Sequence, residues 1–467
     1  MTECRRLPVR RTQTGQLTFS FYQHKQLVAD FKGGQISSDT GLLAIRQLDA
    51  KLGWLGQAAS LISDPRRPDR TELQILDLLR QRVFGLVGGY EDQNDHDRMR
   101  SDPVLKLTCD RGPEDDPLAS QPTVSRFENW PSAREVALMN RLLVEHYIRL
   151  HERKRPWEII LDVDPTDDPC HGAQQLALFN GFYDQYMYLP LLVFDRESGM
   201  LVGVRLRAGN VHAAHGIVGT LKPIVAALRK AFPRTRIIVR ADAGFAVPAL
   251  YEFCERHGLH YLIGIASNEP FKAHAQWDME RLSGRFERTG KPCRYVAGFW
   301  HRAGTWGCKR RVIYKVEVSA EGTNRRFLVT NMKGLPVHLW RLYCDRGTAE
   351  GFIEQFKNAL KADRLSCHRF VANAFRLIQF ALAYNLLRVF GSKLCGTILE
   401  GASIQTIRTR LLKIGARIEQ SVRRVWVHIA SGFPLREVLA LVLERIGRMP
   451  VCVQCTGGPA RAAPRTT

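Results

Sequence analysis

Apolar residues recur every three or four positions in three stretches near the N-terminus. This periodicity predicts amphipathic helices at residues 40–52, 71–87 and 133–150. A polar, acidic stretch, EDQNDHDRMRSDP, lies between the second and third helices and is typical of a loop. Residues 1–155 are therefore predicted to form a helical N-terminal region.

The pattern changes after Pro156, where short apolar runs alternate with longer periodic segments. The short runs predict strands, and the segments 213–232 and 248–257 predict helices. The predicted order β-β-β-α-β-α-β indicates an α/β fold with one antiparallel hairpin. The strands predicted within this segment, residues 156–267, are 159–163, 186–194, 201–206, 236–239 and 261–265.

Residues 268–340 are rich in turn-forming residues, with strands predicted at 311–318 and 326–330, so we expect a mainly β insertion. Helical periodicity then returns at residues 348–361 and 371–390. These helices are expected to close the core that the insertion interrupts.

Three segments complete the predicted domain organisation. Residues 341–395 hold the closing helices of the core. Residues 396–450 form a basic region that mixes helix with a strand predicted at 425–429. Residues 451–467 are predicted to be a disordered tail.

The composition favours a folded protein with a polyanionic partner. Of the 467 residues, 45% are hydrophobic and 24% are charged, which excludes a mainly disordered chain. Lys and Arg number 68 against 46 Asp and Glu, and the resulting net charge of +22 favours nucleic acid as the partner. The longest strongly apolar run, residues 377–387, includes Gln379 and Asn385 and is shorter than the roughly 20 residues of a membrane span. We therefore expect no membrane association.

The cysteines indicate a reducing compartment. The eleven cysteines are mostly scattered singly, which fits free thiols rather than a disulfide framework. Cys452 and Cys455 form one close pair, but no second pair at suitable spacing completes a four-ligand zinc site. The basic N-terminus lacks the apolar stretch of a signal peptide, so we expect a cytoplasmic, nucleoid-associated protein.

Acidic residues stand at the ends of predicted strands and at the start of a late helix. Asp162 and Asp164 are two positions apart on the first strand and face the same side, and Asp242 follows the strand RIIVR. Glu350 and Glu354 begin a predicted helix. Converging carboxylates bind Mg²⁺, and paired Mg²⁺ ions support phosphodiester chemistry. A basic chain with such carboxylates suggests metal-dependent cutting or joining of nucleic acid, although each aspartate alone also fits a turn or cap.

One segment concentrates charge on one helix face. On a continuous α-helix, Tyr343, Arg346, Glu350 and Lys357 fall within an arc of about 60°. This pattern fits metal binding by Glu350 and phosphate contacts by the two cations, and the alternative is a solvated charged face. Glu354 lies only about 40° from Glu350 on the same wheel and is a rival for its role.

The spacing Tyr343-x2-Arg346-x3-Glu350-x6-Lys357 matches the Tyr-Arg-Glu-Lys signature of bacterial DDE transposases. The chain as a whole resembles the insertion-sequence transposases of the thirteen-eighty family, over stretches between about residues 31 and 434 that include LDVDPTDDPCHG, GFYDQYMYLPLLVF, RAGNVHAA and ADAGF. The resemblance implies an α/β fold with a ribonuclease H-like catalytic core, interrupted by a mainly β insertion. A helical N-terminal DNA-binding region and a mixed C-terminal region would flank it.

The resemblance implies a catalytic and metal-binding triad of Asp164, Asp242 and Glu350, with Asp162 and Glu354 as runner-up carboxylates. The triad would hold two Mg²⁺ or Mn²⁺ ions. The implied reaction is hydrolysis of DNA at the element ends, followed by attack of the freed 3′-OH on target DNA.

The resemblance also implies partners. Arg346 and Lys357 would clamp phosphates near the cut, and Tyr343 would contact the flanking strand. Double-stranded DNA, as terminal inverted repeats and as target, is the implied substrate, and a homodimer would hold both ends. The N-terminal region would bind the repeats, and the basic stretch at residues 408–424 would contact DNA or the second subunit.

Related transposases stack a flipped base on a tryptophan of the insertion. Here the candidates are Trp300 and Trp306, and the alternative is ordinary core packing. Neighbouring cations that would meet DNA phosphates are Lys309, Arg310 and Arg311.

Two rival functions remain at this point. A metal-dependent nuclease of the same fold would cut structured DNA without strand transfer. A catalytically inactive copy would bind the repeats and act as a repressor.

Overall fold

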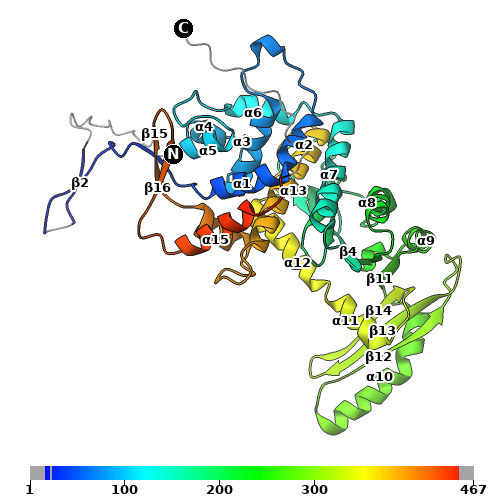
Figure 1. The fold of residues 1–467 in the computed structure, drawn as a ribbon. Helices are drawn as coiled ribbons and strands as arrows, with labels where there is room; N and C mark the ends of the chain where they lie inside the picture. The colour runs from blue at the N-terminus through cyan, green and yellow to red at the C-terminus, as the bar shows by residue number, and fades with distance from the viewer. Residues whose placement is uncertain (1–15, 22–23, 452–467) are drawn as a thin grey trace, which may run out of the picture.

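The computed structural model describes residues 16–21 and 24–451. The Cys452–Cys455 pair and nearly all of the predicted tail lie outside the described residues. Helices of the N-terminal region gather at one end of the molecule, and a helix with three long strands projects at the other (Figure 1). The central part of one large sheet lies between them.

The predicted N-terminal helices are present, with additional short ones. Helix α7 begins with a capping box, in which Ser132 and Glu135 satisfy each other's backbone N–H groups. The acidic stretch predicted as a loop contains α4, and Pro103 begins α5. The helices are α1 (Leu42–Leu52), α2 (Trp54–Ser60), η1 (Pro68–Arg70), α3 (Ile75–Gly88), α4 (Asp95–Met99), α5 (Pro103–Thr108), α6 (Gln121–Glu128) and α7 (Ala133–His151).

The large sheet has eight strands in the order β12-β13-β14-β11-β10-β4-β8-β9. Strands β4, β10 and β11 are parallel, whereas β8 and β9 run antiparallel to their neighbours. The strands predicted at 159–163, 201–206, 236–239 and 261–265 are thus confirmed, whereas the one predicted at 186–194 is divided. The core strands are β4 (Glu158–Pro165), β8 (Leu191–Asp195), β9 (Leu201–Arg205), β10 (Arg236–Ala241) and β11 (His260–Ile265), with helices α8 (Ile217–Ala231), η2 (Ala243–Phe245) and α9 (Pro248–Arg256) between them.

A small second sheet follows β4 directly. The apolar run predicted as one strand at 186–194 is divided at Pro190, and its first half joins this small sheet. The strand order is β5-β7-β6, with β6 and β7 forming an antiparallel hairpin. The strands are β5 (Asp168–Pro169), β6 (Leu178–Asn180) and β7 (Gln185–Tyr188).

The segment 268–340 is not mainly β, because a long helix, α10, precedes its strands. Asn268 caps this helix by accepting from the Phe271 N–H, and apolar side chains spaced along one face pack on the strands. The strands extend the large sheet, since β14 pairs antiparallel with β11. The elements are α10 (Glu269–Thr289), β12 (Cys293–His301), β13 (Arg310–Ser319) and β14 (Gly322–Thr330).

The C-terminal half returns to the N-terminal helices. Strand β15 pairs with β16 on one side and, on the other, with β3 near the N-terminus. The elements are α11 (Pro336–Cys344), α12 (Gly347–Glu354), η3 (Gln355–Ala359), α13 (Phe370–Ser392), α14 (Ile404–Ile407), η4 (Arg408–Leu412), β15 (Ala416–Gln420), β16 (Val425–Ile429) and α15 (Arg436–Gly447); the N-terminal strands are β1 (Leu17–Phe19), β2 (Leu27–Ala29) and β3 (Gln35–Ser37).

Helix α13 is the hub of the packing. It contacts α1, α3, α6 and α7 from the N-terminal region and β9 of the large sheet. Its length and composition are sufficient for a membrane-crossing helix, but most of it is buried inside the protein, as expected of a core helix. The N-terminal helices are thus part of one packed body with the sheet.

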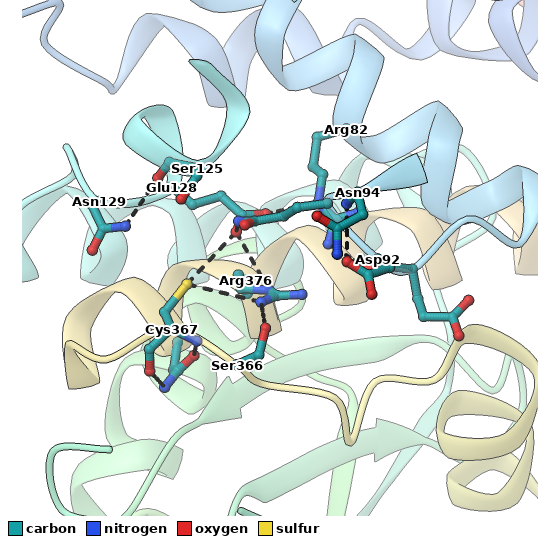
Figure 2. A network of polar contacts seen from close by, with 12 residues as sticks. Arg82, Asp92, Asn94, Ser125, Glu128, Asn129, Ser366, Cys367 and Arg376 are labelled. Atoms are coloured by element: carbon teal, nitrogen blue, oxygen red, sulfur yellow. Dashed lines mark hydrogen bonds and ion pairs between the residues drawn. The ribbon is translucent and has the colours of Figure 1, made fainter. Parts of the chain in front are cut away.

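A buried ion-pair network fastens this contact (Figure 2). Glu128, the last residue of α6, accepts from Arg82 of α3 at 2.7 Å and pairs with Arg376 of α13 at 3.5 Å. All three side chains are buried. Burial alone would raise the pKa of Glu128, but the charges of Arg376 and Arg82 hold it below its ordinary value.

We predict that Glu128→Gln lowers the free energy of unfolding by about 3–5 kcal/mol, because it leaves two buried guanidinium groups without a counter-charge. Urea unfolding at neutral pH measures the change. The contribution of the carboxylate is present above the unfolded-state pKa and is lost as the pH falls through the lower folded-state value. The variant should therefore lack this part of the acid destabilisation. Exposed Glu114→Gln is the matched control, and equal effects of the two changes would argue against the network.

Candidate active site

Two aspartates lie at the ends of adjacent parallel strands. The register pairs Val163 of β4 with Ala241 of β10, so Asp164 and Asp242 follow at the same edge of the sheet. The Asp242 carboxylate accepts from the Gly244 N–H at 2.9 Å, which starts the short helix η2. The carboxyl ends of parallel strands are a common place for functional groups in α/β folds.

Arg346 joins the third carboxylate to this edge. Its guanidinium donates to Asp164 at 2.5 Å and to Glu350 at 3.2 Å. Burial raises the pKa of Asp164 to about 7; Arg346 opposes this shift, whereas the charges of Asp242 and Glu350 add to it. The Glu350 side chain is 64% exposed, so this carboxylate is open to solvent. The structure thus brings the three predicted carboxylates into one electrostatic site.

The spacing of the signature segment suggested one continuous helix. In the structure the segment is divided between α11 and α12. Tyr343 lies in the last turn of α11, Arg346 precedes α12, and Glu350 lies within α12. Lys357 lies on the π-helical turn η3 and donates to Asp167 at 2.7 Å. Single π-helical turns occur often at functional sites. The break between α11 and α12 lets the signature residues surround the strand ends.

Tyr343 lies against the backbone of β11. A Cβ atom placed at Gly264 would come within 2.5 Å of the Tyr343 hydroxyl and 3.0 Å of the Ala243 nitrogen. Burial raises the pKa of Tyr343, and the negative charges of Asp242 and Asp164 contribute to the increase. The absence of a side chain at Gly264 leaves the space for this phenol beside the carboxylates.

The runner-up carboxylates have different surroundings. Asp162 is buried and makes a two-point ion pair with Arg240, at 2.5 and 2.7 Å. Arg240 also donates to the Leu342 carbonyl oxygen. Glu354 is exposed at the end of α12. The structure joins Glu350, rather than Glu354, to Asp164 through Arg346.

Two candidates of the insertion face inward. Trp306 is 5% exposed and packs edge-on against Tyr251 with ring centroids 5.8 Å apart. Arg310 is buried and makes a two-point ion pair with Glu255, both contacts at 2.8 Å. The core-packing alternative therefore holds for Trp306, and Arg310 is not available to a phosphate.

Three candidates of the insertion remain on or near its surface. Trp300 of β12 is 67% exposed and stands opposite Arg311 in the strand register. Lys309 is exposed. Arg311 is half-buried and donates to the Met332 carbonyl oxygen at 3.1 Å.

The donor chemistry of the site fits a divalent cation. The three side chains offer hard carboxylate oxygens. Burial raises the pKa of Asp164, and the negative charges of Asp242 and Glu350 add to this increase. Among the described residues, no three acidic, histidine or cysteine side chains stand close enough to form a ready metal cluster. Arg346 lies between two of the carboxylates and supplies positive charge there.

Sequence reasoning missed two residues beside the carboxylates. Tyr183 lies on the β6–β7 turn, where the charges of Asp167, Asp164 and Asp242 add to the effect of burial and raise its pKa. Arg207 is buried nearby. Their signal was present in the stretches GFYDQY and RAGN, to which no role was assigned.

A family model described as transposase DDE domain group 1 matches residues 19–451. The chain belongs to this family. It is therefore a DNA transposase enzyme, and DDE transposases use divalent metal ions. No curated protein matches the transposase.

Solved structures of two other transposases show a distant likeness. A piggyBac transposase synaptic complex with hairpin DNA is 13% identical, with 90% of this chain and 84% of that chain covered and a TM-score of 0.43. A Mos1 transposase paired-end complex with the left transposon end is 16% identical, with 43% and 60% covered and a TM-score of 0.17. A pre-cleavage Mos1 transpososome is 12% identical, with 69% and 81% covered and a TM-score of 0.17.

We predict that Asp162→Asn and Asp164→Asn have unequal effects on the free energy of unfolding. Asp162→Asn leaves buried Arg240 without its counter-charge and should lower the free energy of unfolding by about 3–5 kcal/mol. Asp164→Asn removes a buried, crowded carboxylate and should change stability little. Urea unfolding of both variants measures the difference. A larger loss for Asp164→Asn would contradict the structural role assigned to Asp162.

We also predict that Gly264→Ala lowers the free energy of unfolding by about 1–3 kcal/mol, because the new methyl group overlaps the Tyr343 hydroxyl. The loss should be smaller in a Tyr343→Phe background, which lacks that hydroxyl. Thermal unfolding of the two single variants and the double variant gives the coupling. Additive effects would show that the phenol does not occupy this space.

Proposed function

We propose that the protein is the transposase of an insertion sequence that resembles the thirteen-eighty family. In this proposal it binds the terminal inverted repeats, cleaves DNA at the element ends and joins the 3′-OH to target DNA. The observation that carries the proposal is the meeting of Asp164 and Asp242 at adjacent strand ends, with Glu350 joined to Asp164 through Arg346.

The strand order supports a ribonuclease H-like core. Three strands in sequence, β4, β8 and β9, form an antiparallel meander, and β10 and β11 then add parallel to β4 on its other side. The first aspartate lies at the end of the first strand, the second follows the fourth strand, and the glutamate comes from a late helix. This is the order that the family resemblance implies.

Asp164, Asp242 and Glu350 would hold two Mg²⁺ or Mn²⁺ ions. When bound, such ions supply an activated water and stabilise the leaving oxygen of a phosphodiester. Asp164 and Asp242 are positioned by the ends of adjacent strands. Asp164 is largely buried, so its charge acts in a medium of lower dielectric constant than water.

The cations of the signature segment would neutralise DNA phosphates. Arg346 pairs with Asp164 and Glu350, and Lys357 pairs with Asp167, so both hold positive charge at the mouth of the site. A phosphate oxygen is an equivalent acceptor for either group, and arginine offers it two parallel donors. Tyr343, fixed against Gly264, would contact the strand beside the cut.

Double-stranded DNA is the proposed partner, and a homodimer would bring two element ends together. The net charge of +22 supports this choice. The proposed division of labour gives repeat binding to residues 1–155 and catalysis to residues 156–267 and 341–395. The insertion at 268–340 and the basic region at 396–450 would hold DNA or the partner copy. The protein would act in the cytoplasm on chromosomal DNA.

Cleavage of a linear duplex that carries the inverted repeats bordering the gene tests the proposal. With Mg²⁺ or Mn²⁺, the wild type should nick at the repeat boundary, whereas Asp164→Asn, Asp242→Asn and Glu350→Gln should lower the rate by at least about 10³-fold, since each removes a metal-binding oxygen. Glu354→Gln, one turn away, is the matched control and should retain activity. Gel shifts should show that all four variants still bind the duplex.

Other outcomes distinguish the rivals. Salt-sensitive repeat binding without cutting by the wild type would favour the inactive, repeat-binding copy. Cutting of branched or hairpin DNA without joining to a target would favour the structure-selective nuclease. Loss of cutting in Glu354→Gln but not in Glu350→Gln would show that Glu354, and not Glu350, is the third catalytic carboxylate.

A further inference from the structure

The hairpin formed by β6 and β7 presents aromatic side chains to solvent. Phe182, at its tip, is 85% exposed, and Tyr183 beside it is 37% exposed. Tyr186 and Phe179 of the same hairpin are also exposed and pack edge-on against each other, with ring centroids 5.6 Å apart. The hairpin therefore carries an exposed aromatic surface, and Phe182 at its tip is not packed into the protein core.

The tip has a defined conformation. The Asn180 side chain accepts from the Phe182 N–H at 3.0 Å and from the Tyr183 N–H at 3.4 Å. Its amide group donates to the Gly209 carbonyl oxygen at 2.6 Å. Asp184 takes a left-handed backbone conformation, with φ of 53°, which lets the chain turn back into β7. Local hydrogen bonds thus fix the backbone of the tip, on which the Phe182 side chain is exposed.

A continuous set of contacts connects this tip to the catalytic edge. Gly209 packs so closely on the backbone of Leu178 and Met187 that a Cβ atom would overlap their carbonyl oxygens. Buried Arg207 donates to the carbonyl oxygens of Leu189 and Ala213 at 2.7 and 2.6 Å. Residues 207–210, the RAGN stretch, thereby contact both β6 and β7.

The contacts continue from Ala213 to the second aspartate. A Cβ atom at Gly244 would lie 2.9 Å from the Ala213 methyl group, and the Gly244 N–H donates to Asp242. On the other side, β5 pairs with β7 and begins four residues after Asp164. The hairpin is therefore linked to the segments that carry both proposed catalytic aspartates. Burial raises the pKa of Tyr183, and the negative charges of Asp164 and Asp242 add to this increase.

We propose that the tip of the β6–β7 hairpin binds DNA at the cleavage position, with the Phe182 ring stacked on an unpaired base. This inference rests on the proposed function and assigns part of its DNA contact. An aromatic ring stacks on any base because every base has an apolar face, and an enzyme that unpairs a nucleotide must replace the lost stacking. An exposed ring, on a hairpin linked to the strand ends that carry Asp164 and Asp242, would supply that replacement near the position of the cut.

The test compares Phe182→Ala with wild type on paired duplex ends and on ends with a single abasic site at each position near the cut. Loss of stacking should slow cleavage of the paired end by roughly 10-fold or more. At one position the abasic site should bring the two rates together, because no base remains to stack. Phe182→Trp should cleave the paired end at nearly the wild-type rate.

Trp157→Ala is the matched control, since Trp157 is another highly exposed aromatic residue, at 75%, and precedes β4, at the opposite end of the strand from Asp164. It should cleave all ends as the wild type does. Equal cleavage of paired ends by wild type and Phe182→Ala would overturn the inference while leaving the proposed function intact. So would an abasic site that rescues Trp300→Ala and not Phe182→Ala, which would move the stacking role to the insertion.

A binding measurement tests the same contact without cleavage. 2-Aminopurine is placed at each position near the cut, and its fluorescence is recorded with Glu350→Gln protein, which the proposed function predicts to bind without cutting. A change at one position that disappears when Phe182→Ala is added supports the stacking contact. If adding Phe182→Ala leaves the fluorescence unchanged at every position, in a complex confirmed by gel shift, the stacking contact is overturned. This outcome holds even if the wild type does not cleave.

Discussion

The Asp162–Arg240 ion pair lies beneath the candidate site and fixes its geometry. It joins β4 to β10 two residues before each strand delivers an aspartate to the sheet edge. Arg240 also donates to the carbonyl oxygens of Leu342 and Asp345, at the break between α11 and α12. One buried guanidinium therefore sets both the strand register and the position of the signature segment. Burying such a pair is costly, so it is better understood as a determinant of register than as a source of stability.

The same device appears a second time, on the opposite side of the core. Glu128 is buried between Arg82 and Arg376, and it joins the N-terminal helices to α13. Both networks place two-point or shared arginine contacts where segments far apart in the sequence must meet in a single way. An apolar contact would allow sliding, whereas a buried charge accepts only its partner. The proposed DNA-binding region is thus packed directly onto the body that carries the carboxylates.

The sequence predicted the core well and the details of the site less well. Strand and helix periodicity located β4, β10 and the helices between them, and the resemblance selected the carboxylates that the structure brings together. The sequence did not reveal that Asp162 forms an ion pair with Arg240, because that pairing depends on strand register. A helical wheel treated the signature as one helix, whereas a break follows Cys344. Burial of Trp306 depends on contacts with distant Tyr251.

The pairing of β14 with β11 has a mechanical consequence. Because the strands of the insertion continue the core sheet, backbone hydrogen bonds between β14 and β11 join the insertion to the core, in addition to the chain connections. Strand β11 is also the strand whose Gly264 receives the Tyr343 phenol. If the insertion contacts DNA as proposed, a load on the projecting end would pass along hydrogen-bonded backbone to the strand that packs against Tyr343. Bending strain in the DNA and the alignment of the reacting groups would be coupled through a single sheet.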